Sequence, residues 1–326
     1  MTKHSTFRRI ANIKALFICI TRRLAFALLG VFVTPAIVNA EKSSIADITV
    51  VSSIKPIQLI STAVMGGVGQ SKVLLPPSAN PHNYQLRPSQ RALLSKADLF
   101  VWVGPELELF LVKVLGSSSV NELSLTNALK LGNAEPVEPS LHQHHHEEHD
   151  EHSHRGSFDP HIWLNPALTK QIATTIAEQL SAQYPALASQ FQLNLEQFIK
   201  QLKITESEIT QLFSGSKQVA IYTFHEAFTH FSDHYGMKID GTITKTPESR
   251  PGAKHLSELA KEIAQNKKIC LVKEPNFKAP YVDSLTRGTE VIVTIADPLA
   301  TNIDNSATGY FEFITSIAKS FHKCTL

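Results

Sequence analysis

The sequence has few cysteines and lacks the short motifs of several common enzyme classes. Only three of the 326 residues are cysteine, and no two of them form a C-x-x-C pair, which argues against a dithiol redox centre. There is also no G-x-S-x-G, no Walker A loop and no G-x-G-x-x-G. The chain therefore has no signature of a serine hydrolase, a P-loop NTPase or a dinucleotide-binding enzyme.

A strong excess of positive charge is absent as well. The formal net charge is +2, and the first forty residues contain six basic side chains and no acidic one. These six are Lys3, Arg8, Arg9, Lys14, Arg22 and Arg23. Without them the net charge is near −4, so we expect no basic face and no nucleic-acid partner.

The first forty residues resemble a secretory signal. A basic leader precedes an apolar run at 24–38, which is short for a membrane span of about 20 residues. Val38-Asn39-Ala40 supplies the modest side chains of a cleavage site, so we expect a signal peptide cleaved after Ala40 and a soluble mature chain. Ile18 before Cys19 does not fit lipoprotein processing. The alternative is an uncleaved membrane anchor.

Cleavage after Ala40 leaves Cys270 and Cys324 in the mature chain. Two cysteines in an exported protein favour one disulfide. It would close a loop of roughly 55 residues and contribute about 4 kcal/mol on the chain-entropy model. It would tie the helix expected at 309–323 to the strand expected at 269–272. A catalytic thiol is the alternative.

The mature chain alternates short apolar runs with helical patterns. This alternation predicts parallel strand-helix-strand units, and therefore an α/β fold with two Rossmann-like lobes and parallel sheets. The expected strands are 48–52, 71–75 and 99–103 in the first lobe and 218–223, 238–243, 269–272 and 291–295 in the second. We expect an N-terminal lobe at 41–184 and a C-terminal lobe at 214–326.

One long helix at 185–213 is expected to link the two lobes. Apolar residues recur there at spacings of three, four and seven, Pro185 lies in the first turn, and Gly215 follows the end. The helix would be roughly 40 Å long. As the only bridge between the lobes, it would allow a small rocking motion.

A segment at 140–158 interrupts the alternation. Seven of its residues are histidines, mixed with four acidic residues and no apolar residue between Leu141 and Phe158. The histidines are His142, His144, His145, His146, His149, His152 and His154. Imidazole and carboxylate bind divalent metals, so we interpret the segment as a solvated, weak metal collector whose ligands protonate near pH ~6.5. A tolerated low-complexity insertion is the alternative.

Four potential metal ligands follow expected strands or begin helical segments. They are His82, His161 (in DPHIWLNP, 159–166), His225 and Asp297. Three imidazoles with one carboxylate or water form a common zinc ligand set. His225 and His230 are separated by five residues, not the four of H-E-x-x-H, so they would not share one helical face. We expect His230 and His234 to be structural or surface residues.

Several segments, in order along the chain, resemble one family. They are PHNYQLRPS (81–89), VWVGPELE (101–108), the histidine-rich segment, DPHIWLNP (159–166), FHEAF (224–228), RPGA (250–253), EPNF (274–277) and DPLATNI (297–303). Together they resemble the periplasmic zinc-binding subunit of high-affinity zinc ABC transporters, and the likeness runs from about residue 47 to the C-terminus.

The resemblance implies two lobes joined by one rigid helix, with Zn²⁺ as the transported ligand in the cleft. It implies a periplasmic location, delivery to a membrane permease driven by a cytoplasmic ATPase, no catalysis and a monomer. The family's metal histidines fall on His82, His161 and His225, and its paired cysteines fall on Cys270 and Cys324.

One departure from the family concerns the fourth ligand. Some relatives have a glutamate directly before the first histidine, where this chain has Pro81. Asp297 or a water is then the expected fourth ligand. Arg87 and Glu274 are candidates to orient the site, or else form ordinary salt bridges.

Three other functions remain open. Manganese-binding relatives have a carboxylate where this chain has His225, and a nitrogen-rich ligand set favours zinc over manganese. A manganese-specific protein of the same family is nevertheless one alternative. The others are a secreted zinc-dependent hydrolase and a metal-responsive adhesin.

Overall fold

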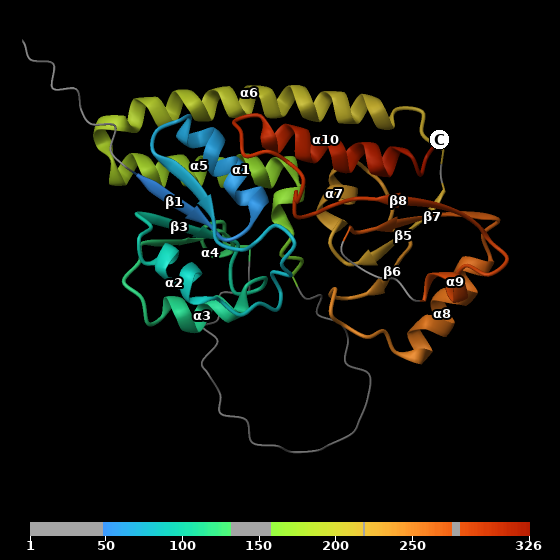
Figure 1. The fold of residues 1–326 in the computed structure, drawn as a ribbon. Coiled ribbons are helices and arrows are strands. Elements are labelled where there is room, and N and C mark those ends of the chain that lie inside the picture. Colours follow the sequence, from blue (N-terminus) through green and yellow to red (C-terminus); the bar gives the residue numbers. More distant parts are fainter. Residues whose placement is uncertain (1–47, 132–157, 218, 276–280) are drawn as a thin grey trace, which may run out of the picture. The chain divides into compact units, whose positions relative to one another are not determined.

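The computed structural model describes residues 48–131, 158–217, 219–275 and 281–326. These residues form two four-stranded parallel sheets with helices around them (Figure 1). The predicted α/β class with two parallel sheets is confirmed. The predicted signal peptide (1–40) lies outside the described residues, as does the histidine-rich segment apart from Phe158, so both stay predictions.

The first sheet has the strand order β2-β1-β3-β4. Its strands are β1 (Thr49–Ser52), β2 (Gln70–Val73), β3 (Leu99–Trp102) and β4 (Glu122–Ser124), and the helices between and after them are α1 (Lys55–Met65), α2 (Pro88–Leu94), α3 (Leu109–Leu115) and α4 (Leu125–Ala128). All four residues of β3 are buried, as expected for a parallel strand covered on both faces. β4 has only three residues, too few to show a period, so the sequence pattern does not predict it.

The second sheet repeats this arrangement in the order β6-β5-β7-β8. Its strands are β5 (Ala220–His225), β6 (Gly241–Thr244), β7 (Lys268–Lys273) and β8 (Glu290–Ile295), with α7 (Thr229–His234), α8 (Ala253–Ala264) and α9 (Val282–Leu285). Ile269 and Leu271 of β7 pack in one apolar cluster with α8 and α9, whereas Cys270 and Val272 belong to the main core. Because successive side chains point to opposite faces, both faces of the sheet are covered.

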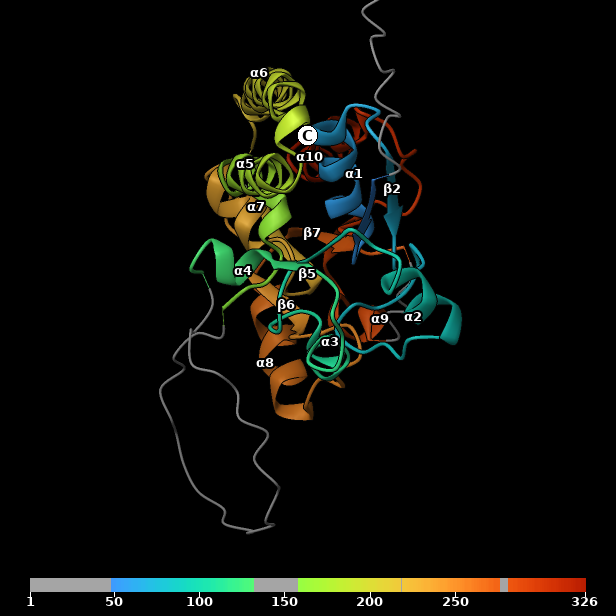
Figure 2. The same ribbon diagram turned by 90° about the vertical axis from the view of Figure 1, so that its left-hand side faces the viewer.

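A long helix connects the two sheets along the chain. After α5 (Pro166–Gln183), a short 3-10 turn at Pro185–Leu187 leads into α6 (Ala188–Phe213), which has 26 residues. This length corresponds to about 39 Å. Figures 1 and 2 show α6 beside α5, and the two helices pack against each other. The predicted helix is thus present with its first turn in the 3-10 form.

The predicted helix links the first sheet to the second along the chain, and another helix also packs across both. Helix α10 (Gly309–His322) packs against α1 and α6 and also contacts β8. Its buried side chains, including Tyr310, Phe313 and Phe321, belong to one apolar cluster that also contains residues of both sheets. Since burying large aromatic side chains is strongly favourable, α10 is a second connection. The lobe boundaries stay predictions, because the described residues fall within one compact unit, Lys42–Leu326.

No helix in the described part of the chain combines the length and apolar composition needed to cross a lipid bilayer.

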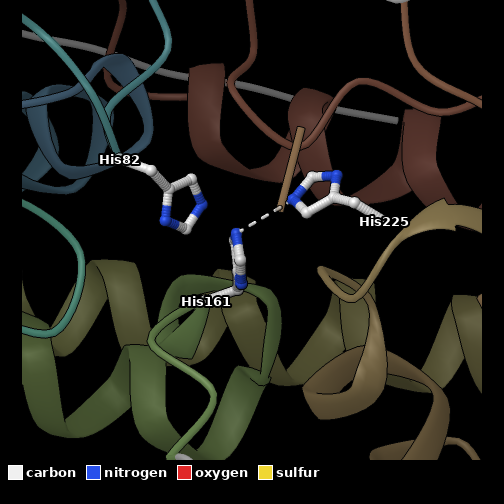
Figure 3. Close-up of side chains that lie close together, drawn as sticks. All are labelled: His82, His161 and His225. Atoms are coloured by element: carbon white, nitrogen blue, oxygen red, sulfur yellow. Dashed lines mark hydrogen bonds between the residues drawn. The ribbon is translucent and has the colours of Figure 1, made fainter. Parts of the chain in front are cut away.

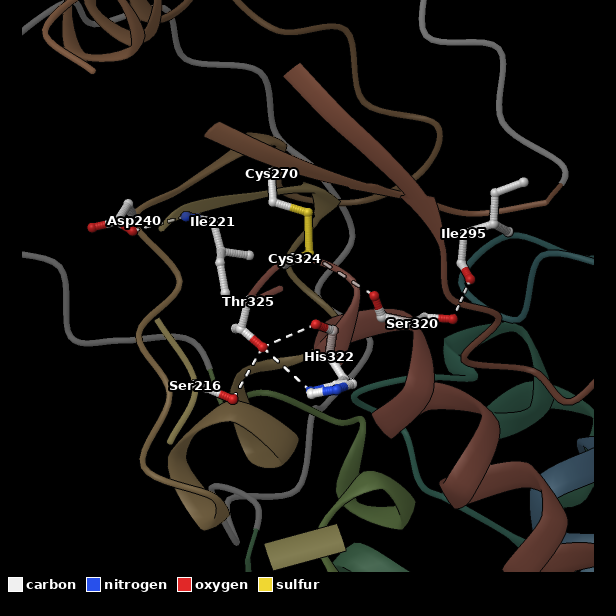
Figure 4. The surroundings of a disulfide bond; sticks show 9 residues. All are labelled: Ser216, Ile221, Asp240, Cys270, Ile295, Ser320, His322, Cys324 and Thr325. Atoms are coloured by element: carbon white, nitrogen blue, oxygen red, sulfur yellow. Dashed lines mark hydrogen bonds between the residues drawn. A yellow bond between two sulfur atoms is a disulfide. The ribbon is translucent and has the colours of Figure 1, made fainter. Parts of the chain in front are cut away.

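The predicted disulfide is confirmed. Cys270 on β7 is bonded to Cys324, which follows α10, and both residues are fully buried (Figure 4). Two hydrogen bonds hold the same end of α10. Ser320 Oγ donates to the Ile295 carbonyl at 2.6 Å, and Thr325 Oγ1 bonds to Ser216 Oγ at 3.0 Å. The disulfide therefore fixes the end of the second bridge to the second sheet.

We expect replacement of both cysteines, Cys270→Ala with Cys324→Ala, to lower the free energy of unfolding by about 4 kcal/mol. The cysteines are 54 residues apart, and without the bond the unfolded chain regains the entropy of that loop. Urea denaturation of the oxidised wild type and the double variant measures the difference. Wild type unfolded in the presence of a reductant is the control and should match the variant. Equal midpoints for oxidised wild type and variant would contradict the prediction.

Candidate metal centre

Three histidines from separate parts of the chain lie together at the ends of the two sheets. His82 lies in the loop between β2 and α2, and His161 lies just before a 3-10 turn at Ile162–Leu164 that leads to α5. His225 is the last residue of β5. Figure 3 shows the three rings turned toward one another. The carboxyl ends of parallel strands are the usual place for ligand sites in α/β folds.

The distances between the rings suit a single metal ion. Each of the three histidines offers one ring nitrogen, and these three nitrogens lie within 4.8 Å of one another. The Nε2 atoms of His161 and His225 are 3.4 Å apart. Nitrogen ligands about 2.0–2.1 Å from a tetrahedral zinc ion would be about 3.3 Å apart. The His161–His225 pair already has this spacing. A small movement of His82 toward the other two rings would bring its nitrogen to the same distance.

Two of the imidazoles are oriented by carboxylates. Asp159 Oδ1 lies 2.7 Å from His161 Nδ1 and also accepts a hydrogen bond from the His161 backbone N–H at 2.9 Å. Glu274, which follows β7, bonds to His225 Nδ1. A carboxylate on Nδ1 fixes the tautomer that leaves Nε2 as a metal ligand. Glu274 therefore has the orienting position that the sequence suggested.

The third imidazole is positioned through its backbone. The His82 N–H donates to Asn80 Oδ1 at 3.0 Å, with the rigid Pro81 between the two residues. His82 Nε2 is buried and has no hydrogen-bond partner. A buried polar atom without a partner is costly, and a metal ion in the cluster would supply one.

Burial favours the neutral form of two imidazoles, those of His82 and His161. Burial, together with the neighbouring His161 and His225, lowers the pKa of His82 to about 3. Burial also lowers the pKa of His161, against the opposing effect of Asp159. Burial alone would raise the pKa of Asp159, but its hydrogen bonds and charge interaction with His161 lower it overall. Near neutral pH, His82 and His161 are therefore unprotonated, as metal binding requires.

The cavity at this site is small. Its volume is about 30 Å³, and the three histidines line it together with Glu274 and Pro298. Such a volume holds an ion and about one water, whereas sites for organic molecules usually have about 300–1,000 Å³. The arrangement fits capture of a single ion.

Two other predicted site residues lie outside the cluster. Asp297 is not among the residues whose ligand atoms lie within 4.8 Å of one another. Its Oδ1 and Oδ2 accept hydrogen bonds from the N–H groups of Leu299 and Thr301, at 3.0 and 2.7 Å. Its role as fourth ligand stays a prediction. Arg87 is exposed and lines a separate cavity beside α2, so it does not orient the site.

The two remaining histidines of α7 have structural contacts, as expected. His230 Nε2 lies 2.8 Å from the Asp159 carbonyl, and His234 Nε2 lies 2.7 Å from Glu206. His230 thus supports the loop that carries His161.

Sequence patterns alone missed two residues that position the clustered histidines. Asp159 and Asn80 each lie two residues before one of these histidines, and each accepts that histidine's backbone N–H. This is the Asx-turn spacing, which short polar side chains favour. The shared D-P-H and N-P-H patterns could have identified both residues.

A family model described as "Zinc-uptake complex component A periplasmic" matches residues 50–324. The zinc uptake protein ZnuA of Yersinia pestis is 32% identical over 301 residues, which cover 89% of this chain and 95% of that protein. ZnuA of Haemophilus ducreyi is 36% identical over 298 residues, with 86% and 94% coverage.

Solved structures agree with the fold. A zinc-bound crystal structure of a ZnuA deletion variant has a TM-score of 0.68 and 23% identity, and covers 85% of this chain and 98% of its own. The laminin-binding protein of Streptococcus agalactiae has a TM-score of 0.68 and 20% identity, with 86% and 100% coverage. At these identities the likeness concerns the fold alone.

We expect the metal-free protein to lose stability as the pH falls below about 6.5. The folded pKa of His82 is about 3, whereas an unfolded histidine has a pKa near 6.5. Between these values the unfolded chain binds a proton that the folded chain does not, so the free energy of unfolding falls by about 1.4 kcal/mol per pH unit for this residue. His161 adds in the same direction.

Urea denaturation of metal-free protein between pH 7 and pH 5 measures this slope. His82→Gln should make the slope shallower by about one proton, because it removes one titrating group. Asn83→Gln, an exposed neighbouring change, is the control for altering the loop. Parallel curves for wild type and His82→Gln would show that the prediction is wrong.

Proposed function

The chain belongs to the family of the periplasmic component A of zinc-uptake complexes, and from this premise we propose that it captures Zn²⁺ and delivers it for uptake. The observation that carries the proposal is the cluster of His82, His161 and His225, whose ligand nitrogens lie within 4.8 Å of one another. The named relatives are zinc uptake proteins, and none of them supports the hydrolase alternative. We propose that the chain acts without catalysis.

The ligand set favours zinc over harder ions. Three imidazoles suit zinc, whereas manganese prefers a larger share of carboxylate and water oxygens. Asp159 and Glu274 are engaged at Nδ1 of His161 and His225, so they act as orienting groups. The proposed fourth ligand is a water or Asp297. Asp297 would have to exchange a backbone hydrogen bond for the metal.

Delivery requires a partner in the membrane. We propose that the mature chain is a periplasmic monomer, released by cleavage after Ala40, which passes zinc to an ABC permease with a cytoplasmic ATPase. Two connections between the sheets, α6 and α10, favour a small movement at the site over a wide opening.

The histidine-rich segment at 140–158 has a separate proposed role. Its density of imidazole and carboxylate groups suits weak binding of several ions at neutral pH. It would raise the local zinc concentration near the protein and would lose its zinc as the pH falls through about 6.5.

His161→Ala should weaken zinc binding at least about 100-fold, because it removes one of three protein ligands. Glu274→Gln should weaken binding about 10- to 100-fold, since it removes the carboxylate that orients His225. Competition titration with a zinc chelator at pH 7.5 measures both effects.

His234→Ala is the matched control for these variants. It also removes a histidine paired with a carboxylate, but one outside the cluster, and should leave the zinc affinity unchanged. An unchanged affinity in His161→Ala would overturn the proposed site.

Deletion of residues 141–155 should leave one tight zinc site per chain and remove only the weaker sites. The three clustered histidines all lie outside the deleted segment, so the tight site does not need it. Isothermal titration calorimetry of the wild type and the deletion variant gives both stoichiometry and affinity. If the deletion abolished the tight site, this division of roles would be wrong.

A further inference from the structure

A surface hydrogen bond between Asn80 and Glu248 joins the loop after β2 to the loop after β6, in addition to the part-buried bond from Thr301 to the Pro77 carbonyl. Asn80 Nδ2 donates to Glu248 Oε2 at 2.7 Å, and the contact is exposed. Asn80 lies in the loop between β2 and α2, whereas Glu248 lies in the loop between β6 and α8. The bond therefore connects the loop that carries His82 to a loop of the second sheet.

The same asparagine also holds a metal ligand. Asn80 Oδ1 accepts the backbone N–H of His82 at 3.0 Å. One amide side chain thus links the Glu248 carboxylate to His82, and the ring of Pro81 limits the freedom of the backbone between them. A movement that breaks the Asn80–Glu248 bond would therefore also displace the backbone of His82.

Glu248 is presented by a tight turn. The Ser249 N–H donates to the Thr246 carbonyl at 3.0 Å, and the hydroxyl oxygens of Thr246 and Ser249 are 2.6 Å apart. Pro247, directly before Glu248, lines the metal cavity. The turn holds the carboxylate at the rim of the cavity.

The rim lies on the side where the cluster is open. His161 and His225 are only 3% and 2% exposed, whereas His82 is partly exposed. A cation must therefore reach the cluster past His82, where Asn80, Pro81 and Pro247 line the cavity. The carboxylate of Glu248 lies near enough to His82 to interact with it electrostatically.

Another contact between the loop that carries His161 and the segment after β8 is buried. Trp163 Nε1 donates to the Pro298 carbonyl at 2.8 Å, and this bond is buried. A buried hydrogen bond is costly to open because its groups lose their partner without gaining water. The exposed Asn80–Glu248 bond can exchange its partners for water, so it is the contact that opens more readily.

We propose that the Asn80–Glu248 hydrogen bond is a latch across the mouth of the metal site, and that these two positioning residues set the rate of zinc exchange. With the latch closed, an ion neither enters nor leaves readily. Opening it lets His82 move outward with its loop. The inference rests on the proposed zinc binding and concerns the exchange rate, not the identity of the ligands.

Two substitutions, alone and combined, distinguish the effect of the hydrogen bond from the effect of the charge on Glu248. Asn80→Asp keeps the acceptor for the His82 N–H but places two carboxylates face to face, which breaks the latch. Glu248→Gln keeps an acceptor for Asn80 and removes the charge. The double variant Asn80→Asp/Glu248→Gln reverses donor and acceptor, and has the wild-type net charge.

The experiment is stopped-flow measurement of zinc association and of zinc dissociation into excess chelator, using the mature chain. Asn80→Asp should raise both rates about three- to tenfold, as expected for a partly exposed hydrogen bond to a charged group. The equilibrium affinity should change less than either rate. The double variant should return both rates to wild-type values, and Glu248→Gln alone should change them little.

Two further variants complete the design. Glu248→Ala removes the latch without touching the acceptor for His82, and it should also speed both rates. Glu290→Gln removes an exposed carboxylate from β8, where it pairs with Lys268 at 3.4 Å, and should leave both rates unchanged. Circular dichroism confirms that each variant is folded.

Three results would overturn the latch. One is an unchanged dissociation rate in both Asn80→Asp and Glu248→Ala. The second is a double variant as fast as Asn80→Asp. The third is slower association with faster dissociation, which indicates a damaged ligand. In all three the wild type still binds zinc, so the proposed function stands. A wild type that binds no zinc at the cluster would overturn the function and the latch together.

Discussion

Three imidazole rings must present one nitrogen each to the same point while most of their surface is buried. Burying polar rings is unfavourable unless their nitrogen atoms have partners. In this protein, carboxylates at Nδ1 of His161 and His225 satisfy one side of each ring and leave Nε2 as the atom that could coordinate a metal. The rest of the structure holds these histidine–carboxylate pairs in position relative to one another.

The positions of these pairs depend on how the two sheets are placed relative to each other. His225 and Glu274 lie at the ends of β5 and β7 in the second sheet, whereas His82 follows β2 in the first. Helices α6 and α10 pack against each other and against α1, and the disulfide attaches α10 to β7. A site made from two sheets needs such connections, because displacements of about 1 Å would spoil metal coordination.

Trp163 joins the site to this framework. Its ring centre lies 5.2 Å from that of His161, and its indole N–H donates to the Pro298 carbonyl of the second half. Its own carbonyl accepts hydrogen bonds from Thr169 on α5 and Tyr310 on α10. The buried side of the site is therefore held by many mutually supporting contacts. Near His82 the Asn80–Glu248 bond is exposed, so under the proposed latch the strength of binding and the rate of exchange depend on different contacts.

The amino-acid sequence by itself determined the class of fold, the long helix, the disulfide pair and the three histidines. Each of these leaves a local signal: alternating apolar runs, a helical period, the cysteine count, and histidines placed between strands and helices. The positions of these residues relative to one another in space leave no such local signal. The convergence of the three histidines, the contact of Glu248 with Asn80 and the second bridge through α10 were decided by tertiary structure. These features depend on contacts between segments far apart in the chain, such as Asn80 and Glu248, which are 168 residues apart, and no local pattern encodes which side chains will meet across such a separation.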